Sequence, residues 1–128
     1  MNQTKTVVQS DKAPKAVGPY SQAIRAGDWL FLSGQLPMDS AGNMAEGGVR
    51  EQTRQVLGNL RAVLESAGLH MRDVVKTTVY MTDLSKFAEM NQVYGEAFES
   101  PFPARATVEV RALPKGAQVE IECVARGG

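Results

Sequence analysis

The sequence predicts one α+β domain, in which a mixed β-sheet of about six strands carries two helices on one face. Its 128 residues suit a single domain, and 43% of them are hydrophobic and 22% charged, as in globular proteins. Two long stretches carry apolar residues at helical spacing. Shorter stretches, separated by turns rich in glycine and proline, are typical of strands. These observations together indicate one domain over residues 1–128.

The first half of the chain predicts three strands and the first helix. Strands are expected at Thr6–Gln9, Tyr20–Arg25 and Trp29–Gln35, and the last two join in a tight hairpin. A helix is expected at Val49–Ala67, with Gly68 ending it. Its apolar face consists of residues that recur every three or four positions: Val56, Leu57, Leu60, Val63, Leu64 and Ala67.

The second half predicts three more strands and the second helix. Strands are expected at Asp73–Met81, Arg105–Ala112 and Gln118–Arg126, the last two forming another hairpin. The helix is expected at Leu84–Glu99, with Asp83 as its N-cap. The order β-β-β-α-β-α-β-β places hairpins around two helical crossovers, which indicates a mixed sheet.

Charge, cysteine and histidine content exclude several classes of protein. The 14 basic and 14 acidic residues give no net charge to collect phosphates, so no nucleic-acid partner is expected. One cysteine, Cys123, and one histidine, His70, exclude a disulfide and metal sites built on cysteine pairs or several histidines. The run Trp29–Leu32 is far shorter than the roughly twenty apolar residues of a membrane helix. The polar segment Met1–Lys15 is unlike a secretory signal, so a cytoplasmic protein is expected.

The last two predicted strands carry the residues best suited to chemistry. Alternation with period two puts the polar side chains of the first strand on one face: Arg105, Thr107, Glu109 and Arg111. If the hairpin turns near Lys115, Glu109 lies opposite Glu120, and Thr107 lies opposite Glu122. Like charges directly opposite destabilise a sheet pair, so a nearby arginine must compensate for the glutamates.

Two interpretations of this polar face stay open. Composition alone favours a solvated face with salt bridges, since exposed polar strand faces are common. The alternative is a site in which the guanidinium of Arg105 or Arg111 binds a substrate carboxylate through two N–H groups. A neighbouring glutamate would then orient or deprotonate a water molecule. Such a site would suit the hydrolysis of a small carboxylate-bearing molecule.

Other segments also suit a ligand, although each has a structural explanation. Ser33-Gly34-Gln35 ends a strand where a ligand can approach the backbone, but a strand-end bulge is the simpler reading. Gly18-Pro19-Tyr20 is a rigid turn that carries an aromatic hydroxyl. Asn91 lies on an apolar helix stripe and needs a partner if it is buried. Trp29 and Phe31 on the uncovered sheet face favour self-association.

Six segments together resemble the Rid/YjgF family of reactive intermediate deaminases. They follow in the family's order along nearly the whole chain: Ala13-Pro14, Gly18-Pro19-Tyr20-Ser21-Gln22-Ala23, Phe31-Leu32-Ser33-Gly34-Gln35, Asn91-Gln92-Val93-Tyr94, Pro103-Ala104-Arg105 through Val108-Glu109-Val110, and Val119-Glu120-Ile121-Glu122. Each piece is short, but the ordered set is specific. The resemblance implies a chorismate mutase-like fold, a homotrimer with sites between subunits, and no cofactor or metal.

The resemblance also implies an activity. Family members hydrolyse 2-aminoacrylate/2-iminopropanoate and 2-iminobutanoate to 2-oxo acids and ammonia. Arg105 matches the family arginine that pairs with the substrate carboxylate, and Glu120 matches the residue that positions the attacking water. The resemblance implies further substrate contacts at matching positions: Tyr20, Ser33, Gly34, Asn91 and Thr107. Many members carry a cysteine where this chain has Thr107, which keeps a hydrogen-bonding group but removes the thiol.

Two other functions stay open at this point. One is a non-catalytic module that binds 2-oxo acids or other small carboxylates, for which Arg105 would serve equally well. The other is an interaction protein, such as a chaperone-like factor or a ribonuclease. The zero net charge counts against a ribonuclease, because RNA-binding surfaces are normally basic.

Overall fold

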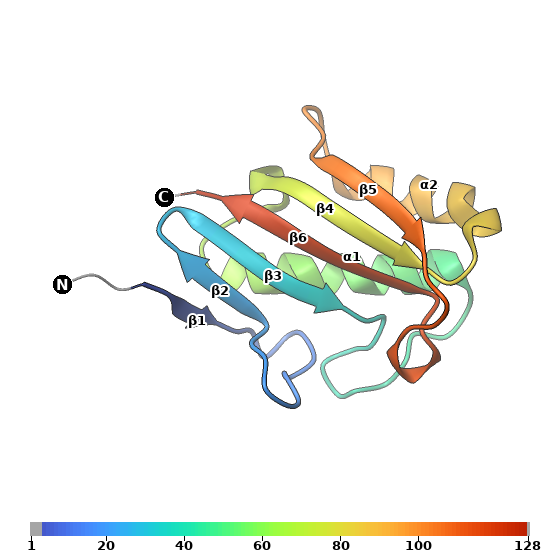
Figure 1. Cartoon of the computed structure of the whole chain (residues 1–128), viewed down its shortest axis with the longest axis horizontal. Coiled ribbons are helices and arrows are strands. Elements are labelled where there is room, and N and C mark those ends of the chain that lie inside the picture. Colours follow the sequence, from blue (N-terminus) through green and yellow to red (C-terminus); the bar gives the residue numbers. More distant parts are fainter. Residues whose placement is uncertain (1–3, 128) are drawn as a thin grey trace.

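The computed structural model describes residues 4–127 and confirms the α+β class, with six strands and two helices. The strands are β1 (Thr6–Val8), β2 (Ala23–Ala26), β3 (Trp29–Gln35), β4 (Val74–Met81), β5 (Ala104–Glu109) and β6 (Val119–Arg126). The helices are α1 (Val49–Ser66) and α2 (Phe87–Ala97). The sheet order is β1-β2-β3-β6-β4-β5 (Figure 1). The sheet is mixed because β4 and β5 run parallel whereas the other neighbours run antiparallel.

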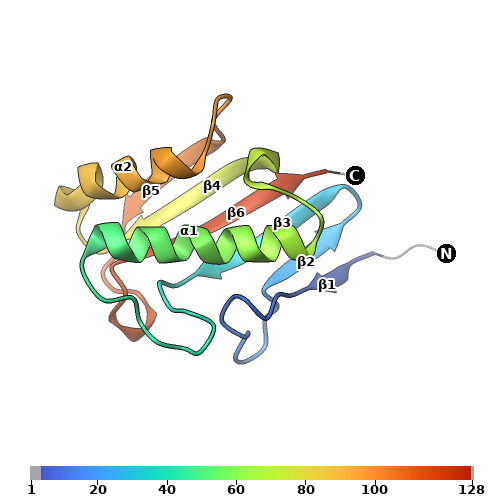
Figure 2. The ribbon, with the colours of Figure 1, turned by 180° about the vertical axis from the view of Figure 1, so that it is seen from behind.

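Both helices cover the same face of the sheet, as the apolar stripes predicted (Figure 2). The core lies between the two layers, and its largest fully buried side chains come from both: Leu30, Leu60, Leu64, Met81, Met90 and Ile121. Gly68 follows α1 with a φ of +78°, a conformation that favours glycine, so the predicted helix end is confirmed. No helix within residues 4–127 has the length and apolar character needed to cross a membrane.

Three predicted elements are longer than the observed ones by two residues or more. The segment before Ala23 is a turn in which the Tyr20 N–H donates to the Gly18 carbonyl at 2.9 Å. A 3-10 turn at Leu84–Lys86 precedes α2, and the carboxylate of Asp83 caps that turn. The strand β5 ends at Glu109 because β4, its only partner in the described sheet, ends at the paired residue Met81.

The predicted hairpin of the last two strands is wrong. Strand β6 lies between β3 and β4, and β5 pairs with the far edge of β4. Glu120 therefore pairs with Tyr80, and Glu122 with Thr78, rather than with Glu109 and Thr107. Strand β6 suits the central position because one whole row of its side chains is buried, namely Val119, Ile121, Cys123 and Ala125. Strand β5 is mostly exposed, as suits an edge.

The face of the sheet away from the helices is uncovered in the single chain. It carries large apolar side chains that are about half exposed, among them Trp29 at 41% and Phe31 at 48%. Val108 on the edge strand, at 40%, extends the same face, since it pairs with Tyr80 and therefore points to the side opposite Thr77. The prediction that this face is half apolar is confirmed, and such a surface suits association with another protein surface.

Candidate active site

Arg105 stands on the edge strand β5 and faces α2. Its Nη1 donates to Asn91 Oδ1 at 2.8 Å, and its Cζ lies 4.7 Å from the Tyr94 ring centroid and 5.4 Å from that of Phe87. These three side chains form one stripe of α2, since residues three and four apart share a helix face. Arg105 stays exposed, and within residues 4–127 no carboxylate pairs with it. A cation that is oriented but not neutralised is suited to bind a carboxylate.

Thr107 lies further along β5 on the same face as Arg105. The two residues pair with Thr77 and Val79 of β4, and both of these are buried beneath the helices. The Thr107 hydroxyl is buried, yet it has no hydrogen-bond partner within the described part of the chain. An unpaired buried hydroxyl costs on the order of 1–3 kcal/mol, so a polar ligand group beside Arg105 would be stabilised there. We call Arg105, Asn91 and Thr107 the edge set.

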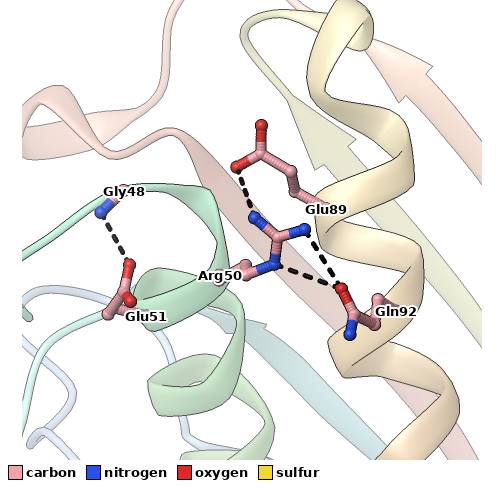
Figure 3. A network of polar contacts seen from close by, with 5 residues as sticks. All are labelled: Gly48, Arg50, Glu51, Glu89 and Gln92. Atoms are coloured by element: carbon pink, nitrogen blue, oxygen red, sulfur yellow. Dashed lines mark hydrogen bonds and ion pairs between the residues drawn. The ribbon is translucent and has the colours of Figure 1, made fainter.

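Helix α2, which carries Asn91, is held against α1 by a network around Arg50 (Figure 3). Arg50 Nε and Nη2 donate to Gln92 Oε1 at 3.2 and 3.1 Å, and Nη1 forms an ion pair with Glu89 Oε1 at 3.4 Å. These groups are exposed, so each contributes on the order of 1 kcal/mol or less to stability. Their effect is geometric, because they fix the turn of α2 that presents Asn91 to Arg105.

A second group of predicted site residues lines a cleft of 530 Å³ beside the end of β3. These residues, which we call the cleft set, are Tyr20, Ser33, Gly34 and Glu120. Ser33 Oγ donates to the carbonyl of Ser21 at 2.6 Å, which fixes its hydroxyl at the cleft. Tyr20 is exposed and follows Gly18, whose φ of +102° makes the turn. The structure therefore brings these four predicted residues together.

Gly34 lies directly against Glu120. A Cβ atom at Gly34 would lie 2.5 Å from Glu120 Oε2, so any side chain there would displace the carboxylate. The regular register between β3 and β6 is interrupted between Leu32 and Gln35, which confirms a bulge at this strand end. The glycine thus preserves the position of the Glu120 carboxylate in the cleft.

Burial raises the pKa of the Glu120 carboxyl, and the negative charge of Glu122 raises it further. Tyr80 pairs with Glu120 across the sheet, and its pKa is raised by burial first and then by the neighbouring glutamates. A carboxylate whose pKa lies above the ordinary range is a stronger base than an exposed one. The raised pKa therefore makes Glu120 suited to accept a proton from water.

The edge set and the cleft set lie on opposite faces of the sheet. Arg105 pairs with Thr77 and Glu120 pairs with Tyr80, and residues an odd number apart on β4 point to opposite sides. The expectation that a nearby arginine compensates Glu120 within one chain is therefore wrong. Within one chain, the guanidinium and the carboxylate therefore belong to two separate groups of side chains, which we call half-sites because each carries only some of the predicted site residues.

Phe87 and Tyr94 are predicted on the same apolar helix stripe as Asn91, without an expected contact to Arg105. In the structure their rings also form the platform on which the guanidinium of Arg105 rests. Their spacing from Asn91 was a usable signal, because all three had to share one helix face. No such regular spacing in the sequence predicts which apolar residues line the cleft, because they come from segments far apart in the sequence.

Comparison with known proteins gives consistent matches over almost the whole chain. The family model described as Endoribonuclease L-PSP matches residues 10–126. A RutC family protein of Pyrococcus horikoshii is 51% identical over 122 residues, covering 94% of this chain and 97% of that protein. The 2-iminobutanoate/2-iminopropanoate deaminase of Homo sapiens is 46% identical over 123 residues, covering 95% and 90%. The crystal structure of E. coli TdcF with bound serine superposes with a TM-score of 0.90 at 37% identity, covering 96% and 99%.

The fold and the two half-sites define a small α+β domain whose polar groups suit a small anionic ligand. The matches make the assignment more specific: the chain belongs to the Rid/YjgF family.

Proposed function

We propose that this protein is a deaminase that hydrolyses 2-imino acids, including 2-iminopropanoate and 2-iminobutanoate, to 2-oxo acids and ammonia. The observation that carries the proposal is the fixed orientation and the unneutralised charge of the Arg105 side chain. Its guanidinium is oriented by Asn91 and two aromatic rings, and within residues 4–127 no carboxylate neutralises it. The name of the human relative, a 2-iminobutanoate/2-iminopropanoate deaminase, supports the same activity.

The complete site forms between two copies of the chain. The edge set of one copy supplies the cation, and the cleft set of the next copy supplies the base. Because the two sets are different surfaces, such an interface is heterologous, and it must close into a ring to remain finite. The family resemblance implies a ring of three copies. The uncovered apolar face with Trp29 and Phe31 gives the copies a surface to bury.

The reaction adds water across the carbon–nitrogen double bond of the imine. Arg105 binds the substrate carboxylate with two parallel hydrogen bonds, which orients the imine and stabilises charge next to it. The Glu120 carboxylate accepts a proton from water while the water oxygen bonds to the imine carbon. Glu120 passes this proton to the imine nitrogen, which gives the neutral carbinolamine. The proton of the carbinolamine hydroxyl then moves through Glu120 to the same nitrogen, so that the carbonyl forms, the carbon–nitrogen bond breaks and ammonia leaves. The protein's residues suffice for this hydrolysis.

A coupled assay tests the proposal directly. A threonine dehydratase generates 2-iminobutanoate, and semicarbazide traps whatever imine has not yet been hydrolysed. We expect this protein to increase the rate of 2-oxobutanoate release and to reduce semicarbazone formation in proportion to its concentration. Calorimetric titration with 2-oxobutanoate measures binding in parallel. Binding without any rate increase would contradict the proposal and favour a carboxylate-binding module.

The pH dependence of this activity is expected to report Glu120. Its carboxylate form is the base, so kcat/KM falls as pH falls through its raised pKa. Replacing Glu122 with glutamine removes the like charge and lowers the pKa of Glu120, so the acidic limb of the pH profile moves to lower pH. The limb is measured from kcat/KM in wild-type protein and in Glu122→Gln under the same buffers. A limb that stays in place, or moves to higher pH, would remove Glu120 from the role of base.

A further inference from the structure

Two buried glutamines line the cleft beside Glu120, and their side-chain amides differ in their hydrogen bonding. Gln22 is 4% exposed and Gln35 is 6% exposed. The Gln22 amide donates to the carbonyls of Ser10 and Pro14 at 3.1 and 2.7 Å, and its Oε1 accepts the Ser10 N–H at 2.6 Å. Within residues 4–127, the side chain of Gln35 forms no hydrogen bond. Because a buried amide normally has partners, Gln35 is available to a polar group that enters the cleft.

Gln35 and Glu120 line the cleft from two sides. The cleft lies at the edge of the sheet where β3 ends with Gln35 and β6 begins with Val119. Gln35 pairs with Ile121, whose side chain is buried beneath the helices, so Gln35 approaches the cleft from the helix side. Glu120 precedes Ile121 and therefore points to the other side of the sheet. A small ligand at this edge can contact both side chains.

A bulge in β3 gives Gln35 this direction. Trp29 and Phe31 point to the uncovered face, and regular alternation would point Gln35 the same way. The register with β6 is interrupted between Leu32 and Gln35, so that Gln35 turns to the buried side, as Leu32 does. Bulges that redirect a side chain are frequent beside active sites. The fold therefore buries an amide at the cleft that a regular strand would have left on the open face.

We propose that the Gln35 amide binds the reacting nitrogen of the substrate, with its Oε1 accepting the N–H groups of that nitrogen as ammonia forms. This inference rests on the proposed imine hydrolysis and adds a residue to its site. Arg105 of one copy binds the carboxylate and Glu120 of the next transfers the protons, which leaves the nitrogen without a partner. An amide suits this role because it accepts a hydrogen bond without removing the proton.

The hydrogen bond to Gln35 strengthens during the reaction. The nitrogen gains one N–H group when the carbinolamine forms and another when ammonia leaves. Donors that carry developing positive charge form stronger hydrogen bonds than neutral ones. Gln35 therefore stabilises the later stages more than it stabilises the bound imine, and such an interaction affects kcat more than KM.

Gln35→Met tests the inference, because methionine has a similar length and lacks the amide. We expect kcat for 2-iminobutanoate to fall by about tenfold or more, the effect of one hydrogen bond in the transition state, with a smaller change in KM. The Tm of the ligand-free variant should equal or exceed the wild-type value, because no hydrogen bond within the chain is lost. A purely structural role would instead lower Tm. The semicarbazide assay and thermal melting measure the two properties.

Two other glutamines give matched controls. Gln22→Met is the same substitution at a buried amide of the same cleft, and it should lower Tm by about 4 °C or more, because Ser10 and Pro14 lose hydrogen bonds. Gln9→Met changes an exposed residue outside the cleft and should leave Tm and kcat at their wild-type values. A Tm that rises in Gln22→Met as well would contradict the assignment of Gln35 as the unpaired amide.

The outcomes separate this inference from the proposed function. If the wild-type protein hydrolyses no imine faster than buffer does, the proposed function itself fails. If the wild type is active and Gln35→Met keeps its kcat, the deaminase proposal stands and only the role of Gln35 is rejected. A Gln35→Met variant that melts well below wild type, that does not fold, or whose loss is confined to KM would overturn the inference as well.

Discussion

Arg105→Ala is expected to reduce imine hydrolysis by at least about a hundredfold in kcat/KM, the loss typical when a preorganised charge stabiliser is removed. The guanidinium is the one group of the edge set that can neutralise a substrate carboxylate. The variant should remain folded, because Arg105 is exposed and its contacts with Asn91, Phe87 and Tyr94 lie at the rim of the core. Thermal melting and the semicarbazide assay measure the two properties separately.

Two further substitutions make this result specific. Arg105→Lys keeps the positive charge but removes the planar fork, so activity should recover only in part. Arg111→Ala removes an exposed arginine that follows β5, outside both half-sites, and should leave kcat/KM near the wild-type value. A folded Arg105→Ala variant with wild-type turnover would reject the mechanism, and equal losses in both alanine variants would indicate a nonspecific effect of charge.

Local patterns were sufficient to predict most of the secondary structure. The helix α1 and its end at Gly68 follow from spacing and from a single glycine, and both are present. The order of the strands could not be predicted from these local patterns. They favour a hairpin of β5 and β6, whereas burial of one face of β6 places that strand in the centre of the sheet. Val119, Ile121 and Cys123 are 0–3% exposed, and only a central strand covered by helices can bury a row in this way.

Because local patterns do not give the order of the strands, the sequence predicts the residues of the site but not their arrangement. Residue types and the family resemblance selected Arg105 and Glu120, and the structure places each beside other selected residues. The alternation of polar and apolar side chains within β5 and within β6 is as predicted, but the two strands do not pair with each other. Once β4 separates them in the sheet, Arg105 and Glu120 fall on opposite faces, and no pattern within either strand signals this separation.

Mixed assemblies of two impaired variants are expected to regain activity, because the proposed site combines half-sites from different copies. In an assembly of Arg105→Ala and Glu120→Ala chains, some interfaces join an intact edge set to an intact cleft set. In a ring of three that contains both kinds of chain, one interface in three has both groups intact, so activity should reach about a third of wild type. Co-expression with two different affinity tags and purification through both isolates such assemblies for the semicarbazide assay.

The control for this experiment is a mixed assembly in which no interface can combine an intact arginine with an intact glutamate. A double variant, Arg105→Ala with Glu120→Ala, co-expressed with Arg105→Ala contains no intact arginine and should show no recovery. If the site were instead complete within one chain, the first mixture would show only the average of its two parent variants. Recovery in that mixture, and none in its control, would assign the guanidinium and the carboxylate of one active site to neighbouring copies.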